Sequence, residues 1–129
     1  MSYQHLKSLY DTITTTPNIT AHVSASNVKL GWQNEIQGYP CITIIQIGGN
    51  AVGRLGYLVA SGQIAEDFGV QIDIYSRQSL KQNYDILTQL TKTMISSGYQ
   101  KLTDTDIWDD KLSANRKMTR WNKYDIYNK

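Results

Sequence analysis

The clearest pattern of apolar and polar positions lies between residues 66 and 97. Over residues 68–76, apolar side chains alternate strictly with polar residues, tyrosine or glycine, which is typical of a half-buried β-strand. After residue 79 the apolar positions recur every three or four residues, at Leu80, Tyr84, Leu87, Leu90 and Met94. This spacing predicts an amphipathic helix over 79–97. Ser79 is a suitable N-cap, and Gly98 lies where a left-handed residue ends a helix.

The N-terminal third of the chain has a weaker pattern. An apolar stripe predicts a helix over residues 2–15, and Pro17 ends it because the residue before a proline avoids helical geometry. Residues 18–39 alternate imperfectly, so we interpret them as a loop with a short strand near 20–24. The run CITIIQIG, 41–48, then predicts a strand that is covered on both faces for part of its length.

The C-terminal third predicts further strands. A short strand is expected at YQKLTD, directly after the helix, and a polar loop is expected over TDTDIWDDKLSAN, 103–115. The run RKMTRWNKYDIY, 116–127, predicts the last strand, and a further strand is expected to begin near Tyr57. This order of helices and strands predicts a single α+β domain over residues 1–129, with an antiparallel sheet and two helices packed on one side.

Composition and charge narrow the functional classes. Lys and Arg total 13 and Asp and Glu total 11, and the resulting net charge of +2 does not by itself indicate nucleic-acid or membrane binding. The longest apolar run is far shorter than the ~20 residues of a membrane-spanning helix, and no signal peptide is expected. The single cysteine, Cys41, lies among apolar residues and is expected to be a core thiol in a reducing compartment.

Three patterns in the sequence bear on reactive or ligand-binding sites. The glycines of GGNAVGRL, 48–55, have phosphate-loop spacing, but Arg54 and Leu55 stand where that loop needs Lys and Ser or Thr. The aspartates at 104, 106, 109 and 110 lack the glycine and glutamate of a calcium loop. His5 and His22 have no partner at metal-ligand spacing. The sequence therefore predicts no catalytic, cofactor-binding or metal-binding residues, and no enzyme.

The closing strand interleaves cations with aromatic residues. Such a pattern suits single-stranded nucleic acid, in which bases stack on aromatic rings beside cations. It also suits a protein interface, because Arg and aromatic residues are enriched in interface cores. The cations lie on both faces of the strand and are diluted by aspartates, which favours a solvated edge or a protein interface over nucleic-acid binding.

The order and spacing of these features resemble the tail terminator, or tail completion, proteins of long-tailed bacteriophages. The resemblance covers most of the chain. It rests on the N-terminal helix, on Tyr39-Pro40 before a strand, on the strand FGVQIDIYS at 68–76, on Gly98-Tyr99 after a helix, and on Arg120-Trp121 in the closing strand.

This resemblance implies a structural protein of the virion, located at the tail neck and assembled in the host cytoplasm. It implies a homo-oligomeric ring, expected to be a hexamer, that caps the tail tube and joins it to a head completion or connector protein. DNA would pass through the lumen without sequence recognition, and no membrane is involved. Two alternatives stay open: another connector or head completion protein of the same assembly, and a small single-stranded nucleic-acid-binding protein.

Two groups of residues are predicted to make the contacts of such a ring. Gly49, Asn50, Gly53 and Arg54 lie in the glycine-rich run 48–57, which is interpreted as an arm that orders on contact with a neighbour. The candidate aromatic and basic anchors are Trp32, Trp108, Arg120, Trp121 and Tyr124.

Overall fold

The computed structural model describes residues 2–31, 33, 35–51 and 63–128. Its helices in these residues are α1 (Ser2–Thr14), α2 (Pro17–Thr20), the 3-10 helix η1 (Ala25–Asn27) and α4 (Leu80–Ser96). Its strands are β1 (Val28–Leu30), β2 (Cys41–Ala51), β3 (Gln63–Ser76), β4 (Gln100–Asp109) and β5 (Ala114–Asn128). The predicted α+β class is confirmed.

The strands form one sheet in the order β1-β2-β3-β5-β4. Strands β2, β3, β5 and β4 pair in antiparallel fashion, as predicted. Strand β1 pairs with β2 in parallel, so the sheet is mixed rather than wholly antiparallel. In this pair Val28 lies opposite Ile42 and Leu30 lies opposite Ile44.

Local signals at the helix ends act as the sequence predicts. The side chain of Ser79 accepts a hydrogen bond of 3.2 Å from the backbone N–H of Gln82, which caps the start of α4. Gly98 adopts a φ of 91° just after α4. Pro17 begins α2, where its missing N–H is not needed. The strand predicted near residues 20–24 is therefore wrong, and that region is helical turn.

The acidic segment expected as a loop is mostly strand β4. Residues 100–109 pair with β5, with one extra residue, Leu102, forming a bulge. Asp104 and Asp106 both accept an ion pair from Lys117 of β5. The carboxylates of Asp104 and Asp106 thus hold β4 to β5 through Lys117. The sequence predicts these aspartates and this lysine in separate segments.

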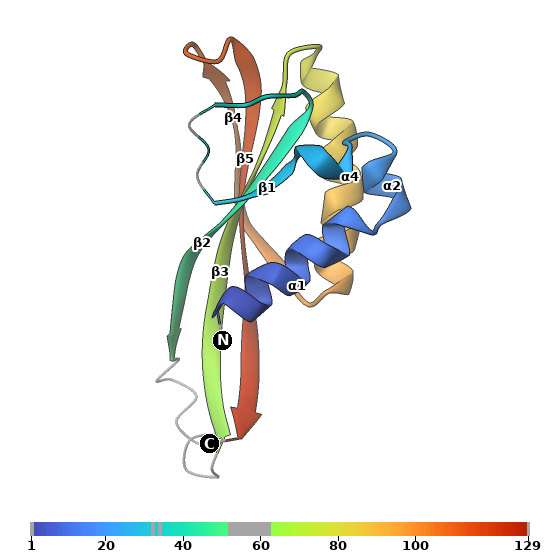
Figure 1. Ribbon diagram of the computed structural model, residues 1–129. Coiled ribbons are helices and arrows are strands. Elements are labelled where there is room, and N and C mark those ends of the chain that lie inside the picture. The colour runs from blue at the N-terminus through green and yellow to red at the C-terminus, as the bar shows by residue number, and fades with distance from the viewer. Residues whose placement is uncertain (1, 32, 34, 52–62, 129) are drawn as a thin grey trace.

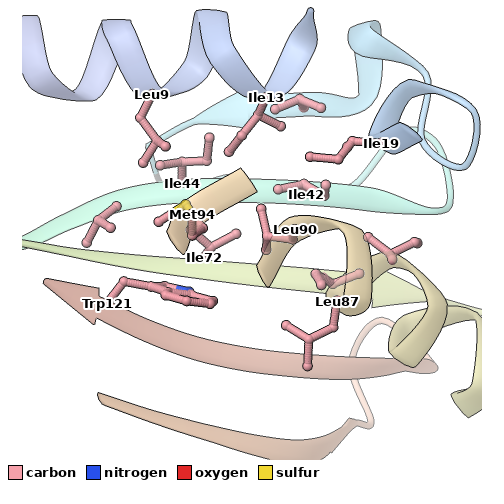
Figure 2. Packing of buried hydrophobic residues seen from close by; sticks show 14 of the residues in the cluster. Leu9, Ile13, Ile19, Ile42, Ile44, Ile72, Leu87, Leu90, Met94 and Trp121 are labelled. Carbon is pink, nitrogen blue, oxygen red and sulfur yellow. The ribbon is translucent and has the colours of Figure 1, made fainter. Parts of the chain in front are cut away.

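The hydrophobic core lies between one face of the sheet and helices α1 and α4, which cover that face together (Figure 1). Phe68, Val70, Ile72 and Ile74 of β3 point into it, because side chains alternate across a strand. Figure 2 shows this packing among Leu9, Ile13, Ile19, Ile42, Ile44, Ile72, Leu87, Leu90, Met94 and Trp121.

From the level of Phe68, whose ring packs against His5 of α1, the sheet continues as a three-stranded arm, which we define as residues 48–51, 63–69 and 122–128. It extends past α1 toward the bottom of Figure 1. Ile47 is an extra residue of β2 opposite the step from Val70 to Gly69, and this bulge marks the start of the arm. Strand β4 pairs with β5 only as far as Asn122, so the arm leaves the body with fewer strands.

Candidate assembly surfaces

The sheet face turned away from α1 and α4, here called the open face, carries a connected polar network. Asp73 accepts a hydrogen bond of 2.8 Å from the Nη2 of Arg116 and bonds of 3.2 and 3.3 Å from the Nε2 of Gln71. The Nε of Arg120 donates to the Oε1 of Gln71 at 3.2 Å. These residues come from adjacent strands β3 and β5, where Gln71 lies opposite Arg120.

In this network the arginine side chains are more exposed than the aspartate, so the outer surface is basic. The side chain of Asp73 is 2 % exposed, whereas that of Arg116 is 21 % exposed. Burial raises the pKa of Asp73, and the charge of Arg116 opposes that shift. The carboxylate is therefore covered while Arg120 is exposed to solvent. This surface is therefore polar, and it presents the guanidinium group of Arg120 to solvent.

The outer edge of the sheet, formed by β4, is the most exposed part of the body. Most of its residues are exposed or partly exposed, and Leu102 and Trp108 are 56 % and 57 % exposed. The ammonium group of Lys117, only 3 % exposed, binds Asp104 and Asp106 and lies 4.5 Å from the ring centroid of Tyr84. This cluster anchors the strand while leaving its outer edge open.

Trp108 lies on the helix side of that edge. Side chains two residues apart on a strand share a face, and Asp106 accepts a hydrogen bond of 2.6 Å from the hydroxyl of Tyr84 in α4. Leu80, one turn earlier in α4, and Tyr84 are themselves 45 % and 43 % exposed. The end of β4 and the start of α4 therefore present large apolar side chains to solvent.

A surface crevice of about 350 Å³ lies at the same end of the sheet. It is lined by Tyr39 and Pro40 before β2, by Arg77 and Gln78 after β3, and by Gln82 of α4. The guanidinium of Arg77 lies 4.3 Å from the ring centroid of Tyr39 and donates two hydrogen bonds to the carbonyl of Leu112. Sequence reasoning missed this crevice, and only the Tyr39-Pro40 pair hinted at it.

The predicted anchors separate into surface and core residues. Trp121 is fully buried, and its indole N–H donates to the hydroxyl of Thr119 at 2.8 Å. Its role as an interface anchor is therefore corrected, because its surface is already covered within the subunit. Trp108, Arg120 and Tyr124 are exposed. Trp32 lies outside the described residues.

The glycine-rich run is only partly described. Gly49 and Asn50 lie in β2, opposite Phe68 and Asp67 of β3, so the chain is strand rather than loop up to residue 51. Gly53 and Arg54 lie outside the described residues. The hairpin partner β3 supplies the backbone hydrogen bonds that a glycine-rich segment would otherwise lack.

Reactive groups are sparse in the described part of the chain. There, no cluster of three or more His, Cys, Asp or Glu residues is arranged to hold a metal ion, and no helix is long and apolar enough to cross a membrane. Cys41 is buried, as predicted, and burial raises the pKa of its thiol to about 11. A thiol of this kind stays protonated and unreactive at neutral pH.

Comparison with known proteins yields a likeness in fold. No protein-family model matches this sequence, and no curated protein matches it. Among solved structures, the chain is similar to one from the virion of a native gene transfer agent (GTA) particle, with a TM-score of 0.66. The two chains are 8 % identical, and the match covers 88 % of each.

Proposed function

We propose that this chain is a structural virion protein that caps the tail tube of a phage-like particle and joins it to the head connector, as a ring of its own copies. The observation that carries the proposal is the shared fold with a chain of a gene transfer agent virion, since the match extends over 88 % of both chains. The resemblance of this sequence to tail terminator proteins supports the same class of particle.

The two faces of the sheet suit a ring with a central lumen. The helices cover one face, and the open face carries the polar network of Gln71, Asp73, Arg116 and Arg120. We place the open face toward the lumen, where a polar surface meets passing DNA without reading its bases. Exposed guanidinium groups attract phosphates regardless of sequence, while the buried carboxylate of Asp73 limits how tightly DNA is held.

The arm supplies a second contact surface. Its strands project past α1 (Figure 1), with β2 ending at Ala51 and β3 beginning at Gln63. We propose that the arm reaches the tail tube or an adjacent subunit, with Gly53 and Arg54 beyond its described strands. Deleting residues 50–55 should leave a folded protein that no longer joins its partner. A variant that still joins would exclude the arm from the contact.

Ring formation is the property to test first. The mass of the purified protein in solution is measured by light scattering over a range of concentrations, and large species are imaged by negative stain. Closed rings, with a hexamer expected from the resemblance to tail terminators, support the proposal. A protein that stays monomeric at every concentration would contradict self-assembly into a ring without a template.

The nearest alternatives belong to the same particle. A head completion protein or another connector would also be a small virion protein, and the shared fold does not separate these from a tail terminator. The distinction lies in location. Antibody labelling of intact particles should mark the junction between tail tube and neck for a tail terminator, and the head side of the neck for a head completion protein.

The alternative function, a single-stranded nucleic-acid-binding protein, has less support. It relied on the cations and aromatic rings of β5, yet Trp121 is fully buried and Lys117 is engaged by Asp104 and Asp106. Arg116 is paired with Asp73. A binder of this kind would show affinity that falls steeply with salt, and we expect weak binding to single-stranded oligonucleotides even at low salt.

A further inference from the structure

A second crevice, of about 240 Å³, lies on the helix side of the sheet. Its walls come from three parts of the chain that are far apart in sequence: helix α1, the turn after α4, and strand β5. The polar side chains that line it are those of His5, Ser8, Thr12, Ser97, Tyr99 and Lys123.

Helix α1 forms one wall of this crevice. His5, Ser8 and Thr12 are spaced by three and four residues, so they lie on one face of the helix. Leu9 lies on the same face and is 3 % exposed, because it packs into the hydrophobic core. The polar row therefore borders the buried face of α1, where the helix meets the rest of the protein.

A single buried ring positions the other groups. Phe68 of β3 is fully buried, and its ring centroid lies 5.1 Å from that of His5 and 6.3 Å from that of Tyr99. Lys123 of β5 lies directly opposite Phe68, and its ammonium group is 5.2 Å from the ring centroid of Tyr99. The imidazole, the phenol and the ammonium are thus arranged around one rigid part of the core.

Lys123 supplies the positive charge of the crevice. Its ammonium group donates to the carbonyl of Ser97 at 3.5 Å. This contact offsets the partial negative charge that the last carbonyl groups of a helix carry. An ammonium has three N–H donors, so two remain for another acceptor. Among the described residues, no carboxylate side chain lines the crevice.

The neutral groups of the crevice are mostly able to donate hydrogen bonds. An imidazole carries an N–H donor whether it is neutral or charged, and the hydroxyl groups of serine and tyrosine donate as well. The hydroxyl of Thr12 is turned to its own helix, where it donates to the carbonyl of Ser8 at 2.9 Å. A group of donors beside an ammonium, with no carboxylate among them, suits an anion that has several acceptor oxygens.

We propose that this crevice binds a phosphate group, as the free ion or as a monoester. Its volume is below the roughly 300–1,000 Å³ of pockets for drug-sized ligands, which favours a small ligand. The oxygens of a phosphate point in tetrahedral directions, so they can accept from α1, from the turn after α4 and from β5 together. A planar carboxylate has only two oxygens. All of these groups belong to one copy of the chain, so the site is independent of the proposed ring.

The test is isothermal titration calorimetry with inorganic phosphate, glycerol 3-phosphate and acetate at constant ionic strength. The wild type should bind one phosphate group per chain and should not bind acetate. Binding of both phosphate compounds would assign the shared group, whereas binding of one alone would assign the free ion or the monoester. Acetate binding as tight as that of phosphate would overturn the assignment to phosphate.

Two variants locate the site. Lys123→Met keeps the apolar stem of the side chain and removes the ammonium. His5→Phe keeps a ring against Phe68 and removes the N–H donor. Each should weaken phosphate binding about tenfold or more, since hydrogen bonds to charged groups are the strong ones. The two variants change different elements, and circular dichroism verifies that each is folded, so either one alone tests the site.

Lys7→Met is the matched control. Lys7 belongs to α1, pairs with Asp11 at 2.7 Å and does not line this crevice. The control also removes one positive charge, and it should keep the affinity of the wild type. An equal loss in the control would show a general attraction of phosphate to a basic protein instead of a site.

The remaining outcomes also decide the matter. A wild type without saturable phosphate binding would overturn the site and leave the proposed virion function untouched. Unchanged affinity in Lys123→Met and His5→Phe would place the bound phosphate elsewhere on the protein. In the wild type, the amide resonances of Gly98 and Tyr99 should shift on titration with phosphate, and shifts confined to other segments would likewise reject this crevice.

Discussion

The ammonium group of Lys117 lies 3.1 Å from a carboxylate oxygen of Asp104, although the lysine side chain is only 3 % exposed. A second carboxylate, that of Asp106, lies 3.3 Å from the same group. A buried ammonium needs such partners, because burial of an unpaired charge is costly. The two aspartates thereby hold the edge strand β4 to β5, and the edge displays Trp108.

Replacing Lys117 by methionine tests this link. Removing one member of a buried ion pair costs roughly 3–5 kcal/mol when the remaining charge is buried. Asp104 and Asp106 are 29 % and 38 % exposed and can be hydrated, so we expect a loss of stability below that range. Urea unfolding measures the change. The matched control is Lys81→Met, whose lysine is 82 % exposed and pairs with Asp85 at the surface. A surface pair contributes about 0–1 kcal/mol, so a larger loss in the control would contradict the assignment.

The pH dependence of stability should reveal Asp104. Hydrogen bonds from Lys101 and then Lys117 lower the pKa of this carboxyl group below its ordinary value. The folded protein then binds a proton less readily than the unfolded chain, so the stabilisation is present above the unfolded pKa and is lost as the pH falls through the folded pKa. The difference in unfolding free energy between wild type and Asp104→Asn should be full at neutral pH and shrink below about pH 4. A difference that stays constant with pH would contradict the ion pair.

Asp73 should behave with the opposite sign. Burial raises its pKa above the ordinary value, so the folded protein takes up a proton before the unfolded chain does. Its contribution to stability therefore increases as the pH falls through the raised pKa toward about 3.9. Denaturant midpoints are measured for the wild type and for Asp73→Asn over the same pH series. As the pH falls, the midpoint of the wild type should rise relative to that of the variant. A steady relative loss for the wild type would show that the pairing with Arg116 dominates.

Substitution by alanine should lower the free energy of unfolding much more at Trp121 of β5 than at Trp108 of β4. Trp121 is fully buried, and Trp→Ala in a core costs about 3–5 kcal/mol. Trp108 is largely exposed, and surface substitutions usually change stability by less than about 0.5 kcal/mol. Thermal unfolding of the two purified variants separates the two. Equal losses would contradict their placement.

The turn after α4 offers a backbone test. Gly98 has a φ of 91°, a region that side chains with a Cβ disfavour. Gly98→Ala should destabilise the protein by about 1–2 kcal/mol. Nothing in space blocks a Cβ at this position, so the loss would come from the backbone alone. Gly98→Asn should lose less, because asparagine tolerates left-handed geometry better. Equal losses in the two variants would point to a steric cause instead.

Local signals account for what could be predicted about the fold. The strand over 68–76, the helix that follows it, the Ser79 cap and the Gly98 turn depend on residues close together in the chain. The period of apolar positions and the capping residues are properties of such short segments. They were sufficient to predict an α+β fold with helices on one side of a sheet.

The sites depended on partners distant in sequence. Trp121 is buried because β5 sets it opposite Val70, whereas Trp108 is exposed because β4 is the edge strand. The acidic segment is a strand because its backbone pairs with β5, where Asp104 and Asp106 also meet Lys117.

The sequence by itself determined the periods, the caps and the fold class, because these arise from neighbouring residues. Only the tertiary structure decided the order of the strands, which places Trp108 on the exposed edge strand β4 and Trp121 in the core. The physical reason is that strand order and register follow from pairing between segments dozens of residues apart. A local pattern of apolar and polar positions does not encode which strand lies at the edge.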